Sequence, residues 1–173
     1  ANFEFTYDGN EHGPNIEGFD ASMMKIEGTA SAVDAGEYNL VVSTIDPVNV
    51  GWADGGEDGT YDWTIYQAPS ALIESPYAIN PTYNGNDLVL MEGGQASGGS
   101  IVYSFDGMEF VETIYGRNAG IYDILYKVKG DENHADSEVF RTSAVINKAV
   151  GEIISAPQMI EGLVYSGQPQ TLI

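Results

Sequence analysis

The stretch Asp34-Ala35-Gly36-Glu37-Tyr38 occurs a second time in this 173-residue chain, as Asn118-Ala119-Gly120-Ile121-Tyr122. Both copies begin with small and polar residues that favour a turn. The apolar side chains then alternate with polar ones, at Leu40 and Val42 after the first copy and at Ile124 after the second. Alternation with a period of two predicts a strand with one buried face. The two copies therefore predict an all-β chain built from repeated units.

Two further landmarks repeat in the same order. Residues 5–10, 81–86 and 163–168 each contain a Tyr, a polar residue and a Gly in succession, and residues 63–68 are similar to residues 144–149. Repeats of this kind indicate successive structural modules. We predict three units: module A, residues 1–68; module B, residues 69–149; and residues 150–173 as the opening segment of a third module.

The strand signals inside each module are short and separated by turn residues. Tyr61, Trp63 and Ile65 share one face of a predicted strand, and Asp106-Gly107 is a two-residue signal for a type I′ hairpin turn. About seven strands in roughly 75 residues are typical of a β-sandwich.

The first repeated stretch resembles the Asp-x-Gly-x-Tyr sequence that leads into strand F of immunoglobulin domains. The resemblance implies that Tyr38 and Tyr122 are tyrosine-corner residues, whose hydroxyl groups bond to an upstream backbone group. The position two residues later, a cysteine in antibody domains, is Leu40 in module A and Ile124 in module B. Aliphatic packing is then expected in place of the disulfide.

The whole repeat resembles the tandem immunoglobulin-like repeats, often called MBG-type, of large bacterial surface proteins, which also occur in phage tail fibres. The resemblance implies β-sandwich modules arranged end to end, in an extracellular location at a cell surface or in a virion fibre. It also implies a non-catalytic structural spacer of an adhesin or fibre. The expected partners are neighbouring modules of the same array or head-to-tail copies of the chain.

The charge of the chain excludes several classes of partner. There are 26 Asp and Glu residues against 6 Lys and Arg, which gives a formal net charge of −20. So few basic residues cannot form a surface for nucleic-acid phosphates or anionic membranes. No run of about 18 apolar residues predicts membrane insertion. The lack of cysteine excludes disulfides and thiolate chemistry.

The sequence predicts no enzyme. The two histidines, His12 and His134, lie in turn and loop sequences and are predicted to be solvated. No Gly-x-Ser-x-Gly motif presents a nucleophile, and no glycine-rich motif indicates a nucleotide cofactor.

Two acidic loops offer oxygen ligands for a hard cation such as Ca²⁺. The candidate ligands are Asp54, Glu57 and Asp58 in module A, and Asp131, Asn133 and Asp136 in module B. Neither loop has the spacing of an EF-hand. A second interpretation therefore stays open, in which both loops are solvated turns and the chain has no cofactor.

Aromatic residues near the first acidic loop indicate an alternative function, which is binding rather than spacing. Trp52, Tyr61, Trp63 and Tyr66 gather around it in the sequence, and exposed aromatic rings can stack on sugars. The alternation places Trp63 in the core, which leaves Trp52 as the open case. The alternative to a spacer is thus a module that binds a glycan or a host protein.

The predicted modules differ at their starts. Module B has a lead-in of 14 residues before Tyr83, whereas module A has six residues before Tyr7. Residues 150–173 provide a lead-in and an opening strand without the rest of a module. We expect a stretch of a longer array, and the alternative is that residues 150–173 donate a strand to module A of another copy.

Overall fold

The computed structural model describes residues 3–53 and 55–171, and all regular secondary structure in this part of the chain is β-strand. This confirms the predicted all-β class. The strands are β1 (Phe3–Thr6), β2 (Met24–Gly28), β3 (Gly36–Thr44), β4 (Gly59–Tyr66), β5 (Ala68–Pro69), β6 (Ala71–Glu74), β7 (Tyr77–Ala78), β8 (Leu88–Val89), β9 (Met91–Glu92), β10 (Gln95–Ser97), β11 (Gly99–Ser104), β12 (Tyr115–Gly116), β13 (Gly120–Gly130), β14 (His134–Ala135) and β15 (Phe140–Ile146).

Residues 3–67, named the N-terminal part, form one four-stranded sheet in the order β1-β4-β3-β2. Strands β3 and β4 are antiparallel, with Tyr38 opposite Trp63, and β1 runs parallel to β4. The alternation noted in the sequence produces this sheet because it directs Leu40, Trp63 and Ile65 to one buried face. The prediction that Trp63 belongs to the core is confirmed, since its side chain is 2% exposed.

Residues 68–147, named the central part, contain a three-stranded sheet in the order β11-β13-β15 and several short strand pairs. The pairs are β6 with β10, β7 with β9, and β8 with β12. One hydrophobic cluster joins the two groups of strands, because Leu90 and Ile114 from the short-strand side pack with Tyr103, Ile124 and Ile146 from the sheet. The central part is therefore a two-layered β-structure with its core between the layers.

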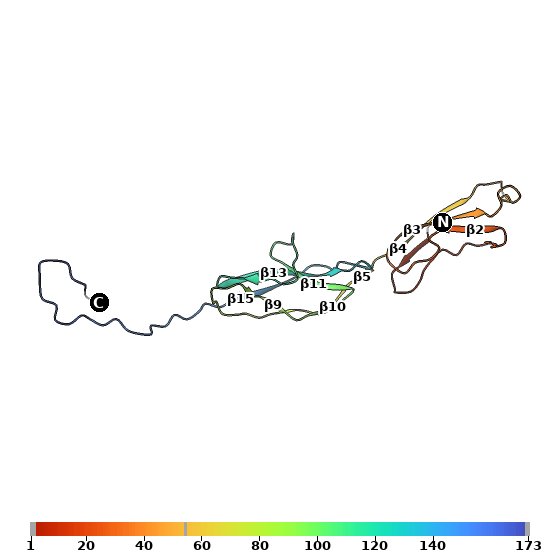
Figure 1. Cartoon of the computed structure of the whole chain (residues 1–173). Coiled ribbons are helices and arrows are strands. Elements are labelled where there is room, and N and C mark those ends of the chain that lie inside the picture. Colours follow the sequence, from red (N-terminus) through yellow and green to blue (C-terminus); the bar gives the residue numbers. More distant parts are fainter. Residues whose placement is uncertain (1–2, 54, 172–173) are drawn as a thin grey trace.

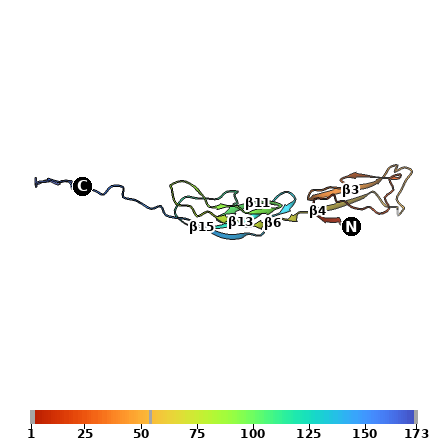
Figure 2. The same cartoon turned by 90° about the horizontal axis from the view of Figure 1, so that it is seen from below.

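The N-terminal part, the central part and the C-terminal segment, residues 148–171, follow one another along the same direction in both views (Figure 1, Figure 2). Strand β5 lies at the expected boundary between residues 68 and 69, and it pairs in parallel with β14. Residues 151–171 are exposed and contain no strand.

The predicted type I′ turn at Asp106-Gly107 is wrong. Gly107 has a φ of 79°, but Asp106 does not have the positive φ that the first central position needs. The Asp106 carboxylate instead accepts the backbone N–H of Met108, and Ser104 Oγ accepts that of Gly107. Side-chain acceptors therefore build a wider loop. Among the described residues, no helix is long and apolar enough to cross a membrane.

Candidate functional site

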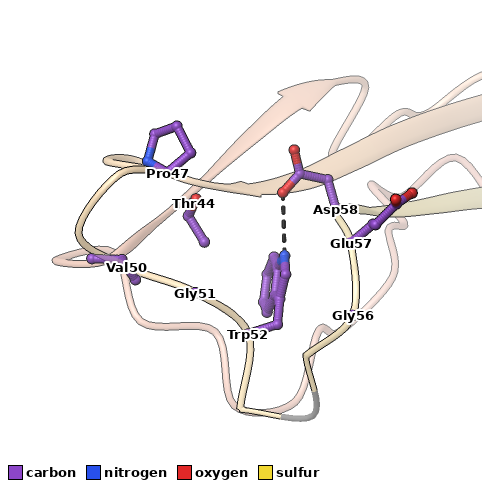
Figure 3. Close-up of a pocket in the computed structure, with 8 residues that line it drawn as sticks. All are labelled: Thr44, Pro47, Val50, Gly51, Trp52, Gly56, Glu57 and Asp58. Atoms are coloured by element: carbon purple, nitrogen blue, oxygen red, sulfur yellow. Dashed lines mark hydrogen bonds between the residues drawn. The ribbon is translucent and has the colours of Figure 1, made fainter.

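The loop between β3 and β4 holds the first candidate site, an open pocket of about 430 Å³ beside Trp52. Figure 3 shows the Trp52 indole pointing from the loop towards Asp58, and its Nε1 donates to Asp58 Oδ1 across 3.3 Å. Thr44 and Pro47 line the other side of the pocket. The half-buried indole with a carboxylate at its edge can stack on a flat ligand and accept a hydrogen bond from it.

The first predicted set of calcium ligands lies in this same loop. Glu57 and Asp58 both line the pocket, whereas Asp54 lies outside the described residues. The Asp58 carboxylate is already an acceptor for Trp52. Among the residues that the structure describes, no group of three or more His, Cys, Asp or Glu side chains is arranged to hold a metal ion.

The second acidic loop, residues 131–136, is held by internal partners. Asp131 accepts hydrogen bonds from the backbone N–H of Asn133 and pairs with His134 Nδ1 at 2.7 Å. Asp136 accepts bonds from Lys127 Nζ and from the backbone N–H of Gly130. Because Lys127 is a cation, it supplies the positive charge that a metal ion would bring to Asp136.

The same contacts lower the pKa of both carboxyl groups. The hydrogen bond with His134 is the main cause for Asp131, followed by the Asn133 backbone. The hydrogen bond from Lys127 is the main cause for Asp136, followed by the Gly130 backbone. Each bond favours the charged form of the carboxyl group. The structure therefore uses these acidic residues to hold the loop.

Asn133 uses its side chain to connect the central part to the N-terminal part. Its Oδ1 accepts the backbone N–H of Ala35 at 2.7 Å, and its Nδ2 donates to Asp34 Oδ1 at 3.0 Å. Close by, Gln67 Nε2 donates to the backbone carbonyl of Glu132 across 3.1 Å. The loop that was considered for calcium thus forms a junction between the two parts of the chain.

Aromatic packing adds to this junction. The rings of His134 and Tyr7 meet edge to face with centroids 5.3 Å apart. The prediction of solvated histidines is wrong: both side chains are only 23% exposed, because His134 packs on Tyr7 and His12 stacks on Phe5 at 4.9 Å. Each imidazole also bonds to a nearby aspartate, which for His12 is Asp8.

The two repeated tyrosines make the same local bond. The Tyr38 hydroxyl donates to the backbone carbonyl of Asp34, and the Tyr122 hydroxyl donates to that of Asn118, both across 2.7 Å. Both side chains are half-buried. Tyr38 also stacks on Trp63 with ring centroids 4.6 Å apart. The bond fixes the turn before β3, and this turn presents Asp34 and Ala35 to Asn133.

Sequence reasoning did not identify the junction. Tyr7, Asp34 and Asn133 were each noted, as a repeat landmark, a turn residue and a candidate metal ligand. The available signal was their position next to strand ends, since Tyr7 follows β1, Asp34 lies before β3 and Asn133 follows β13.

Comparison with models of protein families finds no match, and comparison with curated proteins finds no similar sequence. Among solved structures, the chain is similar to one described as "Structures of Clostridium thermocellum CbhA fibronectin(III)-like modules". The TM-score is 0.35 and the identity is 13%, with 91% of this chain and 96% of that chain covered. Similarity at this level does not establish a common fold, so the all-β assignment stands on the strands described above.

Proposed function

We propose that this chain is a non-catalytic structural spacer. Its tandem immunoglobulin-like modules, arranged end to end, would provide length and stiffness in an extracellular protein such as a cell-surface adhesin or a virion fibre. Its partners would be neighbouring modules of the same array or head-to-tail copies of the chain. Nucleic acid, membrane insertion and a cofactor have no part in this function.

The observation that carries this proposal is the junction around Asn133. A flexible tether would leave the two parts without contacts, whereas here Asn133, Gln67 and His134 all make contacts across the boundary. The connection between β4 and β5 is also very short, with only Gln67 between them. Short connections and specific contacts restrict bending, which is what a spacer requires.

A binding module is the second candidate, and the pocket beside Trp52 favours it. The indole, Glu57 and Asp58 offer an aromatic face together with carboxylate acceptors, a combination that suits a sugar. A glycan array separates the two functions. A spacer gives no signal on it, whereas a glycan-binding module gives a signal that Trp52→Ala removes.

Small-angle scattering of the chain tests the spacer function. We expect an elongated particle whose stiffness decreases in Asn133→Ala, because that variant loses both bonds to residues 34 and 35. Asn49→Ala is the matched control, since Asn49 bonds only within the exposed loop, to Asp46. A compact envelope for the unmodified chain would contradict the proposal.

A further inference from the structure

One connection in the central part is much longer than its counterpart in the N-terminal part. Residues 29–35 join β2 to β3, whereas residues 105–119 join the corresponding strands β11 and β13. Residues that one repeat has in addition to its neighbour form surface loops, and such loops often carry the binding site of a repeat protein. We therefore searched this connection for a ligand site.

The additional residues lie between β11 and β12. The bridge of His12 with Ala32 corresponds to the pairing of Leu88 with Gly116. The first member of each pair follows the opening turn, in which a side chain accepts the backbone N–H two residues later. The second member lies two residues before the repeated Ala-Gly landmark. The extra length of the connection therefore precedes Gly116 and forms a loop beside the sheet.

Hydrogen bonds hold this loop in a defined shape. Tyr103 and Val111 exchange two backbone hydrogen bonds, at 2.7 and 2.8 Å, which close the loop at its base. Asp106 Oδ1 accepts the Met108 N–H at 2.8 Å and the Ser104 hydroxyl at 3.0 Å. These bonds lower the pKa of the Asp106 carboxyl group, with the Met108 N–H as the main cause. Asp106 is thus a charged residue that already has its partners.

An open pocket of about 390 Å³ lies between this loop and β12. Its walls are mainly apolar and include Phe105, Val111, Ile114 and Tyr115. The Phe105 and Tyr115 side chains are 50% and 52% exposed, so each ring has a free surface. Apolar walls with a small number of polar groups are typical of sites for small molecules.

Tyr103 contributes a polar group to this pocket that the fold does not use. The side chain lines the pocket and is only 5% exposed. Among the residues that the structure describes, none bonds to its hydroxyl. The hydroxyl is not fully enclosed either, because the fully enclosed side-chain atoms without a partner are Ser43 Oγ and Ser70 Oγ. A buried tyrosine usually has a partner for its hydroxyl, and a ligand in the pocket would supply one.

The charges at the pocket select the class of ligand. Among the described residues that line it, Asp106 and Glu109 are carboxylates and none is basic. In the described part of the chain, no group bonds to the Glu109 carboxylate. Burial raises the pKa of the Tyr103 hydroxyl, with the nearby Tyr126 as a second cause, so this hydroxyl is neutral and can accept a hydrogen bond. The pocket thus offers two free acceptors and an excess of negative charge.

We propose that this pocket binds a small organic cation in which an ammonium group is joined to an apolar chain or ring. The ammonium N–H groups donate to the Glu109 carboxylate and the Tyr103 hydroxyl, and the apolar part packs on Phe105 and Tyr115. The faces of the two rings also attract the positive charge. This inference goes beyond the spacer function, and the pocket shares no residue with the junction around Asn133.

Three probes with the same six-carbon chain test the ligand class: hexylammonium, hexanol and hexanoate. We expect saturable binding of hexylammonium to the full chain in an NMR titration. Hexanol should bind about tenfold more weakly, because it lacks the charge-assisted hydrogen bond. Hexanoate should not bind, since the carboxylates repel it. Equal affinities for hexylammonium and hexanol, or no saturable binding of hexylammonium, would overturn the proposal.

The same titration locates the site. The pocket beside Trp52 also combines an aromatic ring with carboxylates, so the place of binding has to be shown. We expect the hexylammonium-dependent shifts at the methyl groups of Val111 and Ile114, which line the proposed site. Shifts at the Trp52 indole in their place would overturn the proposal.

A matched pair of variants tests the role of charge. Glu109→Gln should lower the affinity for hexylammonium about tenfold and leave that for hexanol unchanged. Glu112→Gln removes the same charge from an exposed residue that does not line the pocket. It should change the affinity by less than about twofold, because salt screens charges outside the site. Equal losses in both variants would show attraction to the net charge of the chain and would overturn the site.

Tyr103→Phe separates binding from folding. The hydroxyl has no partner within the described residues, so its removal should leave the melting temperature unchanged. The affinity for hexylammonium should fall about fivefold, the loss expected for one hydrogen bond. An unchanged affinity would overturn the role of Tyr103 in the site. The spacer function fails separately, through a compact particle in scattering, whatever these titrations show.

Discussion

The N-terminal part and the central part share their landmarks and their central antiparallel ladder, yet their cores differ. Among the described residues, the buried apolar side chains of the N-terminal part are Leu40, Val42, Trp63 and Ile65, whereas the central part has ten. The hydrophobic cluster lies entirely in the central part. Similar strands therefore produce different amounts of buried apolar surface.

The layer that faces each sheet explains the difference. In the central part, Leu90 and Met91 are buried because β6 and β7 pair beside them. The corresponding positions in the N-terminal part are Pro14 and Asn15, in a segment that pairs with no strand among residues 3–53 and 55–171. Backbone pairing within one sheet leaves one face open, and only a second layer removes that face from water.

Truncation at two corresponding positions should have the largest effect on this comparison. Leu40 and Ile124 both lie two residues after the repeated tyrosine and are 1% and 0% exposed. We expect Ile124→Ala to cost about 4 kcal/mol of unfolding free energy and Leu40→Ala about 2 kcal/mol. The N-terminal part has fewer buried apolar side chains around its core, so we expect its core to relax more easily around a smaller side chain.

Denaturant unfolding with two probes measures both costs. Trp52 and Trp63 lie in the N-terminal part and the central part has no tryptophan, so tryptophan fluorescence follows the N-terminal part alone. Circular dichroism follows both parts. The N-terminal part should unfold at the lower denaturant concentration. Equal costs for the two variants, or coincident transitions by both probes, would show that the two cores are energetically equivalent.

The alternation was sufficient to predict strands β3, β4 and β13, because that information is local. The expectation of about seven strands in each module is wrong for the N-terminal part, whose described residues form four. Alternation predicted the burial of Leu40, Trp63 and Ile124 without any knowledge of their partners. The junction could not be predicted in this way, since Asn133 and Asp34 are 99 residues apart and their contact depends on how the two sheets meet. The wide loop at Asp106 was not predicted for a related reason. The side chains of Ser104 and Asp106 accept backbone N–H groups of the loop, and the turn that Asp-Gly usually forms is absent there.

The tyrosine corners should contribute equally to the two parts. We expect Tyr38→Phe and Tyr122→Phe each to cost about 1 kcal/mol, the usual net value of one hydrogen bond. Both hydroxyls donate to a backbone carbonyl across 2.7 Å, and Tyr122 also accepts the Asn118 N–H from the same turn, so this contribution should not follow the difference between the cores. Thermal or denaturant unfolding of the two variants measures it. A cost in one part only would show that the corner depends on the completeness of the core.

Low pH should reduce the stability that the first turn contributes in the N-terminal part but not in the central part. Asp8 accepts the Asn10 N–H and bonds to His12, which lower its pKa from 3.8 to about 2, whereas the corresponding Asn84 cannot titrate. A lowered pKa in the folded state stabilises the fold above pH 3.8, and this contribution is lost as the pH falls towards 2. Asp8→Asn should reduce the pH dependence of the N-terminal part in that window, measured by tryptophan fluorescence. An unchanged pH profile would show that the Asp8 bonds do not contribute to stability.

The smallest expected effect is that of Ca²⁺ on the two acidic loops. Asp131 and Asp136 already pair with His134 and Lys127, so a metal ion would have to displace two cationic or hydrogen-bonding partners before binding. In the N-terminal part, Asp58 accepts a bond from Trp52, which is a weaker competitor for a metal ion. We expect isothermal titration with Ca²⁺ to give no saturable heat and the melting temperature to stay unchanged. Saturable heat would contradict this, and its loss in Asp58→Asn but not in Asp136→Asn would assign the ion to the loop of the N-terminal part.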